Sequence, residues 1–240
     1  MDGSTEESRT DWTEHVEPRV AVIGIGGAGC NIVNDIYWTG DCSIEVIAIN
    51  MDRRALSDVG AHHHINICKK VTRGEGAKGD PELGRSCGKA HSQEIEEALN
   101  GFDVAFIIAG MGGGTGTGVT PVVAEIARKL NMITFVIAIN PFSFETARRR
   151  VAKEGLRRIR QSGCINVVVE NELLLKNRPE LSMEKAFQET NRSIFNFIKD
   201  NAQKVKQAFI DQSGEMDGVM KDAGEEKVSG SCPFEAVRIS

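Results

Sequence analysis

Short apolar runs alternate with longer amphipathic segments along most of this chain. Runs rich in β-branched residues predict strands over 19–25, 44–50, 64–68, 103–110, 132–140 and 164–170. Most of these runs are continuously apolar, which is typical of strands buried on both faces of a sheet. Segments with helical periodicity lie between them, over 29–38, 81–100, 118–130 and 146–161. The alternation predicts an α/β fold with a doubly wound, mostly parallel sheet.

A long helical pattern over 182–209 follows the last predicted strand, and the chain then turns polar. We therefore expect a polar extension over 1–17, an α/β domain over 18–181 and a long core helix over 182–210. A post-helix loop and polar tail are expected over 211–240.

Composition and charge narrow the class of protein. The chain has 240 residues, of which 40% are hydrophobic, so it can bury a substantial core. Its apolar runs are too short to span a bilayer and its first residues do not resemble a signal peptide, so we expect a cytoplasmic protein without direct membrane insertion. The net charge of −5 argues against nucleic acid as a partner and favours a nucleotide.

The cysteines and histidines do not alter the expectation of a cytoplasmic, nucleotide-binding protein. Six cysteines occur without a CxxC pair, so we expect reduced and mostly buried thiols and no disulfide framework. The run His62-His63-His64 could place only its first and third rings on the same face of a strand. A surface strand start is the better interpretation, and we expect no metal site there.

The first predicted strand runs into a glycine-rich turn. Gly24, Gly26 and Gly29 fit the pattern G-x-G-x-x-G at the start of a helix, where bare amides and the helix N-terminus form an anion site. Asp52 follows the second strand, close to where a dinucleotide fold places its ribose-binding carboxylate. At this point an NAD-dependent oxidoreductase remains an open hypothesis.

A second glycine-rich segment, GGGTGTG at 112–118, follows the fourth predicted strand and enters a helix. A dinucleotide fold needs only one such loop, whereas two loops on the same sheet edge can enclose a chain of phosphates. Thr115 and Thr117 add hydroxyl donors. Because the segment lacks the lysine of a Walker A loop, charge neutralisation is expected from amides, helix dipoles and Mg²⁺ bound through the phosphates.

The segment GGGTGTG resembles the signature loop of the tubulin and FtsZ family of GTPases. Further segments are similar to that family in the same order, at 22–34, 48–56, 72–85, 141–150, 167–176 and 185–191. The resemblance covers roughly residues 19 to 210 and is strongest to prokaryotic, archaeal FtsZ-like proteins. It implies GTP or GDP as the ligand, and a cytoskeletal role linked to cell division or cell shape.

The resemblance also implies a role for individual residues. Phosphate contacts are expected from two groups on opposite sides, Gly26, Gly27, Ala28 and Gly29, and Gly113, Gly114, Thr115, Gly116 and Thr117. The γ-phosphate would be sensed by Gly76, Ala77 and Lys78, and the ribose region by Glu145 and Arg149. The guanine edge would be read by Asn31, Asn171 and Asn191, with Phe187 stacked on the base. Phe187 and Asn191 are spaced i, i+4, so they share a helix face.

Three departures from the family pattern affect the expected activity. Arg192 stands where FtsZ proteins commonly carry an aspartate, and it cannot accept hydrogen bonds from guanine. The family's catalytic acids lie in a loop after the long helix and act on the next subunit. Asp211, Glu215 and Asp217 are the candidates here, but their spacing differs from the family's. We also expect these 240 residues to lack the family's C-terminal domain, in either a truncated or a naturally short protein.

Two functional hypotheses therefore remain beside the oxidoreductase. In the first, the chain self-associates through its nucleotide face, and the acids of one subunit act on the neighbour's GTP. In the second, it is a GTP-binding regulatory or assembly module with little hydrolysis, forming a dimer or pairing with full-length relatives.

Overall fold

A computed structural model describes residues 17–170, 172 and 182–222 of the chain. Its centre is a six-stranded sheet in the order β3-β2-β1-β4-β5-β6, and every neighbouring pair is parallel. The strands are β1 (Val20–Ile25), β2 (Ile44–Asn50), β3 (His63–Asn66), β4 (Val104–Gly110), β5 (Ile133–Asn140) and β6 (Ile165–Glu170). The doubly wound parallel sheet predicted from the sequence is confirmed.

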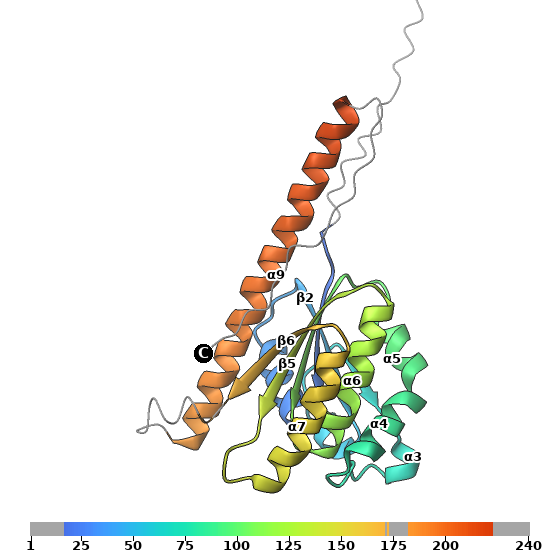
Figure 1. The fold of residues 1–240 in the computed structure, drawn as a ribbon, viewed down its shortest axis with the longest axis vertical. Helices are drawn as coiled ribbons and strands as arrows, with labels where there is room; N and C mark the ends of the chain where they lie inside the picture. The colour runs from blue at the N-terminus through green and yellow to red at the C-terminus, as the bar shows by residue number, and fades with distance from the viewer. Residues whose placement is uncertain (1–16, 171, 173–181, 223–240) are drawn as a thin grey trace, which may run out of the picture.

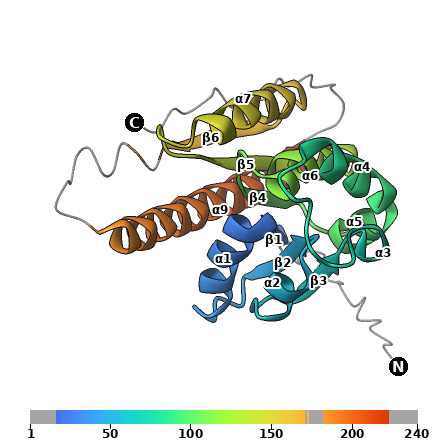
Figure 2. The same ribbon diagram turned by 90° about the horizontal axis from the view of Figure 1, so that it is seen from below.

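Helices cover both faces of this sheet (Figures 1 and 2). One face carries α1 (Gly26–Tyr37), α2 (Arg53–Ser57) and α9 (Met183–Asp222). The other carries α3 (Lys69–Thr72), α4 (Pro81–Ala90), α5 (Ser92–Leu99), α6 (Gly114–Lys129) and α7 (Thr146–Gln161). The central strands β1, β2, β4 and β5 contribute alternate side chains to the two cores, which explains why their sequences are apolar at nearly every position, whereas the edge strand β3 contributes only Ile65.

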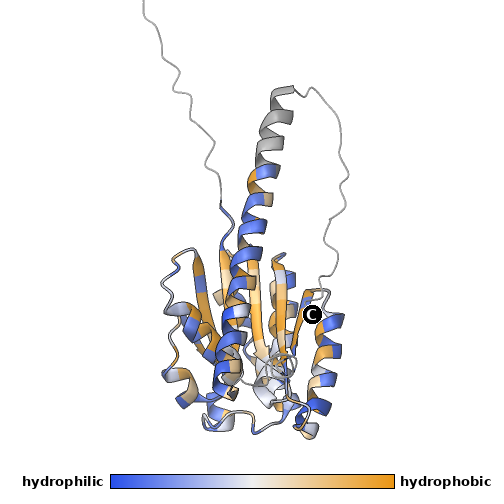
Figure 3. Cartoon of the chain, turned by 90° about the vertical axis from the view of Figure 1, so that its left-hand side faces the viewer, coloured by the Kyte–Doolittle hydropathy of each residue, from blue (hydrophilic) through white to orange (hydrophobic). Residues whose placement is uncertain are grey.

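The core is densest where the central strands meet. Val22 of β1 is in register with Val46 of β2 and with Phe106 of β4. The ring of Phe106 stacks on that of Phe135 with centroids 4.7 Å apart. Figure 3 shows the apolar strands in the middle and mixed, largely hydrophilic helices around them. Stacked aromatic and β-branched pairs of this kind fix the register of a parallel sheet.

The segment predicted as one helix over 81–100 divides at His91 into α4 and α5. The Nε2 atom of His91 accepts a hydrogen bond of 2.9 Å from the backbone amide of Cys68, and its Nδ1 lies 2.8 Å from the Glu94 carboxylate. These contacts hold a backbone conformation outside the α region at His91. The helical periodicity continues across the break, which is why the sequence pattern does not reveal it.

The long final helix differs from the sequence-based expectation at its end. It runs to Asp222, so residues that were expected to form a loop from 211 onward are helical up to that point. Gly214 and Gly218 favour a loop on propensity, but each costs only about 1 kcal/mol inside a helix. The helix extends well past the edge of the sheet (Figure 1).

No helix within the described ranges is both long enough and apolar enough to cross a membrane.

Candidate nucleotide-binding pocket

A pocket of about 690 Å³ opens at the carboxyl ends of the central strands. The strand order reverses between β1 and β4, because the chain continues outward from β1 in one direction and from β4 in the other. Loops on either side of such a switch point diverge and leave a crevice, where doubly wound folds bind their ligands. The volume is within the range of small-molecule sites.

Two helix N-termini face this pocket without a side-chain cap. Helix α1 begins at Gly26 after β1, and α6 begins at Gly114 after β4. Neither N-cap residue, Ile25 or Gly113, offers a side-chain hydrogen bond to the first turn. The first amides of a helix have no partner inside the helix and carry its positive dipole end. The two helices together therefore present a ready site for a polyanion.

Two other helices near the pocket, α2 and α4, have side-chain caps, whereas α7, whose N-cap residue is Glu145, has none. Asp52 accepts hydrogen bonds from the amides of Arg54 and Ala55 at the start of α2. Asp80 does the same for Glu82 and Leu83 at the start of α4. Capping carboxylates at α1 and α6 would repel an anion, so glycine-rich starts at these two helices fit an anion site.

Glycines bring the two loops together and leave room between them. A Cβ atom at Gly26 would lie 3.0 Å from the backbone nitrogen of Gly116, so the two loops nearly touch there. A Cβ atom at Gly27 or at Gly113 would meet nothing within 4 Å, although both residues line the pocket. The absent side chains of Gly27 and Gly113 thus correspond to open pocket space, the cradle that a phosphate chain requires.

The wall beside α6 is the segment 72–80, which carries Gly76, Ala77, Lys78 and Gly79 into the pocket. Lys78 has a left-handed backbone, with φ of 47°. Its ammonium lies 2.7 Å from the Glu75 carboxylate, and this hydrogen bond lowers the pKa of Glu75. The segment therefore brings a cation to the rim of the pocket.

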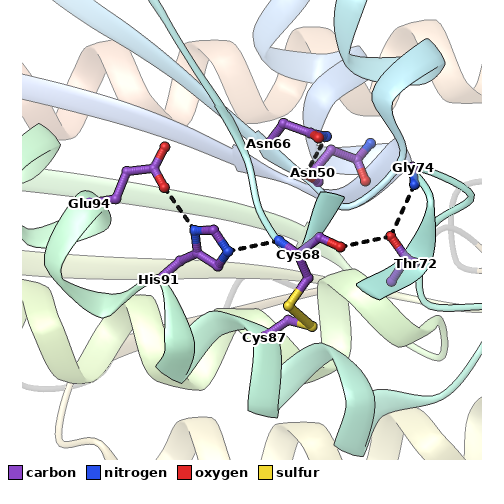
Figure 4. The surroundings of a disulfide bond; sticks show 8 residues. All are labelled: Asn50, Asn66, Cys68, Thr72, Gly74, Cys87, His91 and Glu94. Carbon is purple, nitrogen blue, oxygen red and sulfur yellow. Dashed lines mark hydrogen bonds and ion pairs between the residues drawn. A yellow bond between two sulfur atoms is a disulfide. The ribbon is translucent and has the colours of Figure 1, made fainter. Parts of the chain in front are cut away.

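A disulfide between Cys68 and Cys87 anchors this wall to α4, which corrects the expectation of reduced thiols throughout (Figure 4). The two cysteines are 19 residues apart in sequence, but β3 and α4 bring their Cα atoms to 5.5 Å. Cysteine spacing alone carries no sign of this, because the partner strand and helix are brought together only by the fold.

Hydrogen bonds continue from the disulfide into the wall. The carbonyl of Cys68 accepts from the Thr72 hydroxyl, and the Thr72 hydroxyl accepts from the amide of Gly74 (Figure 4). Asn66 donates to the carbonyl of Asn50, a residue that lines the pocket. The start of the segment 72–80 is thus held by covalent and polar contacts.

The opposite wall comes from the loop between β5 and α7. Glu145 lines the pocket and pairs with Arg148 at 2.8 Å, and Arg148 also lines it. Phe142 packs against Phe187 of α9 in an edge-to-face contact with centroids 5.9 Å apart. Phe187 is 44% exposed and lies at the pocket rim. An aromatic face beside a polyanion cradle suits a planar heterocycle.

Most of the residues expected from the sequence lie around this single pocket. Those that line it are Gly26, Gly27, Ala28, Gly76, Ala77, Lys78, Gly113, Gly114, Thr115, Gly116, Glu145 and Phe187. The described residues that do not line it are Gly29, Asn31, Thr117, Arg149 and Asn191. Asn171 lies outside the described residues.

Three of the residues outside the lining have contacts elsewhere in the fold. A Cβ at Gly29 would overlap the carbonyl oxygen of Ile108, so this glycine permits α1 to pack against β4. The buried hydroxyl of Thr117 accepts a 2.8 Å hydrogen bond from the amide of Gly112 and fixes the second loop. Arg149 points elsewhere, with its guanidinium 3.9 Å from Glu172.

Several lining residues were missed by sequence reasoning. Arg148, Asn140 and Phe142 line the pocket, although the basic run and the strand end did not single them out. The signal for Arg148 was its position three residues after Glu145, which allows an ion pair on one helix face. Phe142 was overlooked because aromatic residues after a strand are commonly core residues.

The candidate catalytic acids lie far from this pocket along the chain. Asp211 is exposed on α9 and accepts a hydrogen bond of 2.7 Å from Gln207. At a rise of about 1.5 Å per residue, it is about 36 Å along the helix from Phe187. The backbone positions of Glu215 and Asp217 continue the same helix, and their side chains are outside the described part.

Within the described ranges, no cluster of three or more His, Cys, Asp and Glu side chains is suited to hold a metal ion. The pocket lining contains two carboxylates, those of Asp52 and Glu145. Both already have protein partners, in the cap of α2 and in the ion pair with Arg148. Bound phosphates would add oxygen ligands for a cation beside these two carboxylates.

Comparisons with known proteins agree with this geometry. Residues 19–179 match the family described as Tubulin/FtsZ family, GTPase domain. Cell division protein FtsZ 1 of Pyrococcus horikoshii is 37% identical over 224 residues, which is 92% of this chain and 60% of that protein. Cell division protein FtsZ 2 of Methanocaldococcus jannaschii is 39% identical over 197 residues, covering 80% of this chain and 52% of that one.

Solved structures give the same result. The empty FtsZ dimer of M. jannaschii superposes with a TM-score of 0.74 at 36% identity, covering 79% of this chain and 56% of that chain. CetZ2 from Haloferax volcanii, at 24% identity and a TM-score of 0.65, shares the fold. The chain thus spans between half and two thirds of the length of these relatives. On the match of its α/β domain, the chain belongs to the Tubulin/FtsZ family.

Proposed function

We propose that this pocket binds a guanine nucleotide, GTP or GDP. The observation that carries the proposal is the pair of uncapped helix N-termini at the switch point of the sheet. The phosphates are held from one side by the loop that includes Gly26, Gly27, Ala28 and Gly29. They are held from the other by the loop of Gly113, Gly114, Thr115, Gly116 and Thr117. Family membership supports the same ligand.

The charge of the nucleotide is balanced by several weak contributions, with no Walker-type lysine among them. Lys78 lies at the rim beside Gly76 and Ala77, where a terminal phosphate extends from the two loops. Arg148 lies on the opposite wall, so the pocket is flanked by a cation on each side. Mg²⁺ is expected to bind through the phosphate oxygens and water, because the pocket carboxylates are already engaged.

The base and ribose occupy the end of the pocket near α9. Phe187 supplies an aromatic face for the base, and Glu145 an acceptor for ribose hydroxyls. Asn31, Asn171 and Asn191 are proposed to read the guanine edge. Arg149 remains a candidate for the ribose and phosphate region, together with Arg148.

We further propose a cytoskeletal role linked to cell division, with self-association through the nucleotide face. Relatives named as cell division proteins support this role, and the solved M. jannaschii FtsZ is described as a dimer. The length of α9 puts Asp211 beyond reach of its own pocket, so any action of Asp211, Glu215 or Asp217 on GTP must be on a neighbouring subunit. Such acids would orient the attacking water, while the pocket supplies positioning and charge.

The alternative is a GTP-binding regulatory or assembly module that hydrolyses little or no GTP. The observation that favours it is the engagement of both pocket carboxylates, which leaves a single subunit without a free general base among the described lining residues. Such a module would act as a dimer or by pairing with full-length relatives.

One experiment separates the two. GTP turnover per molecule is measured over a wide range of protein concentration with Mg²⁺ present. Turnover that rises with concentration supports the shared site, and substitution of Asp211, Glu215 or Asp217 should then abolish the rise. Tight GTP binding with a flat and near-zero rate contradicts self-activated hydrolysis and supports the module.

A further inference from the structure

Helices α1 and α9 contact one another beside the pocket, and each contributes a residue to its lining, Gly27 and Phe187. Gly27, Asn31 and Asp35 are spaced at four-residue intervals on α1, and all three are exposed. Phe187 and Asn191 have the same spacing on α9. Side chains four apart lie on the same face of a helix, so each set forms a row along its helix. Helices α1 and α9 lie next to one another (Figure 2). The row on α1 begins at a pocket-lining glycine, and the row on α9 begins at the pocket-lining phenylalanine.

A hydrogen bond joins the two rows. The Nδ2 atom of Asn191 donates to the Oδ2 atom of Asp35 over 2.9 Å, although the residues are 156 positions apart in sequence. This contact fixes which end of the Asn191 amide faces α1. It also uses one of the two carboxylate oxygens of Asp35, and no second hydrogen bond of this carboxylate is seen within the described part of the chain.

The chemistry of guanine calls for an acceptor at this position. Guanine presents two neighbouring donors, its ring N1–H and its exocyclic amino group, next to one carbonyl acceptor. A carboxylate can accept from both donors, whereas an asparagine side chain has a single acceptor oxygen. Arg192, which follows Asn191, offers donors only. Asp35, which contacts Asn191, is the carboxylate that could supply these acceptor oxygens.

We propose that Asp35 determines the specificity for guanine, as an acceptor for the base N–H groups and as the residue that orients Asn191. This inference rests on the proposed nucleotide binding. Asp35 lies on α1, and the first turn of this helix forms the first phosphate loop. The same helix would thus read the phosphates at its first turn and the base two turns later.

The test is the variant D35N, which keeps the size of the side chain and an oxygen that can accept from Asn191. An amide in place of the carboxylate accepts one base N–H and turns a donor toward the other. GTP affinity should fall about tenfold to hundredfold, the range for hydrogen bonds to a charged group. Xanthosine triphosphate, which has a carbonyl where guanine has its amino group, should bind D35N more tightly than it binds the parent protein. ATP affinity should not change.

Two further variants make the result specific. D200N removes an exposed carboxylate of α9, farther along that helix from Phe187, and should leave the ratio of GTP to xanthosine triphosphate affinity unchanged. The double variant D35N/N191D moves the carboxylate to the opposite helix and should restore part of the GTP preference. Thermal unfolding of each variant checks that the fold is retained.

The outcomes distinguish this inference from the function on which it rests. An unchanged affinity ratio in D35N, with GTP still preferred over ATP, would show that Asp35 and Asn191 form only a surface contact, and would overturn the proposal. A parent protein that binds no GTP, or binds ATP equally well, would contradict the proposed function itself.

Discussion

The two ends of the pocket are built in different ways. The phosphate end is made of backbone, where two helices begin at adjacent strands and glycines allow close contact. The proposed base end has the side chain of Phe187 at its rim, and beside it a hydrogen bond joins Asn191 of α9 to Asp35 of α1, far apart in sequence. Glycine spacing therefore indicates the two loops of the first end, while the second depends on how one helix is placed against another.

The difference extends to how firmly each end is held. A Cβ at Gly118 or Gly84 would overlap backbone across the contact between α6 and α4, so these two helices are packed backbone to backbone. The segment 72–80 is anchored next to them through Cys68 and Cys87. At the base end, by contrast, Phe187 is 44% exposed. We expect a preformed phosphate site and a base site that forms its contacts mainly on binding.

The largest effect should follow removal of the disulfide that anchors the phosphate wall. The variant C68S/C87S should lose about 3 kcal/mol of unfolding free energy, the entropic value for a loop of this size. Urea unfolding with and without a thiol reductant measures it. The reductant should destabilise the parent protein by a similar amount and leave the variant unaffected. Equal midpoints for oxidised and reduced parent protein would mean that the cross-link does not stabilise the fold.

A methyl group in the cradle should weaken binding of anything that carries the phosphate chain. G113A adds a Cβ where there is open pocket space and no protein neighbour, so folding should be preserved. Affinity for GTP and for inorganic tripolyphosphate should both fall, by about 1–3 kcal/mol of overpacking. Competition titrations provide the measurement. G88A in α4, where a Cβ makes only ordinary 3.5 Å contacts, is the matched control and should bind normally.

Truncation of Phe187 should weaken ligands that carry a base and leave ligands made only of phosphate unaffected. F187A should weaken GTP by about 1–3 kcal/mol, the usual value for stacking of a base on an aromatic side chain. Tripolyphosphate carries no base, so its affinity should be unchanged. A parallel loss for both ligands would show that Phe187 supports the whole pocket, and the distinction between the ends would fail.

The smallest expected effect is a difference in reactivity between two thiols, which tests the packing of the phosphate end alone. Cys30 lies in the first turns of α1 beneath the phosphate loop, and burial raises its pKa to about 12. Cys42 is exposed. In brief alkylation of the native protein followed by peptide mass mapping, Cys42 should be modified and Cys30 protected. Rapid modification of Cys30 would indicate that the phosphate end opens more readily than its packing implies.

The sequence predicts the features of this molecule that depend on local patterns better than those that depend on tertiary contacts. The strands, the two glycine loops and helix α7 are local patterns, so their positions follow from the order of residues along the chain. The cross-link of Cys68 with Cys87, the break at His91 and the pairing of Asn191 with Asp35 depend on tertiary contacts across 19 to 156 residues. Local periodicity does not contain this information. Arg148 was missed for a related reason, since only the orientation of α7 distinguishes it from Arg149.

The central claim is that one pocket holds a guanine nucleotide, by backbone at its phosphate end and by side chains at its base end. The most direct measurement is equilibrium titration of the full chain with GTP, ATP, NAD and tripolyphosphate in the presence of Mg²⁺. The account predicts one GTP site per chain, weaker ATP binding, and tripolyphosphate that competes with GTP for the same site. Absence of GTP binding, or equal affinity for GTP and ATP, would contradict it.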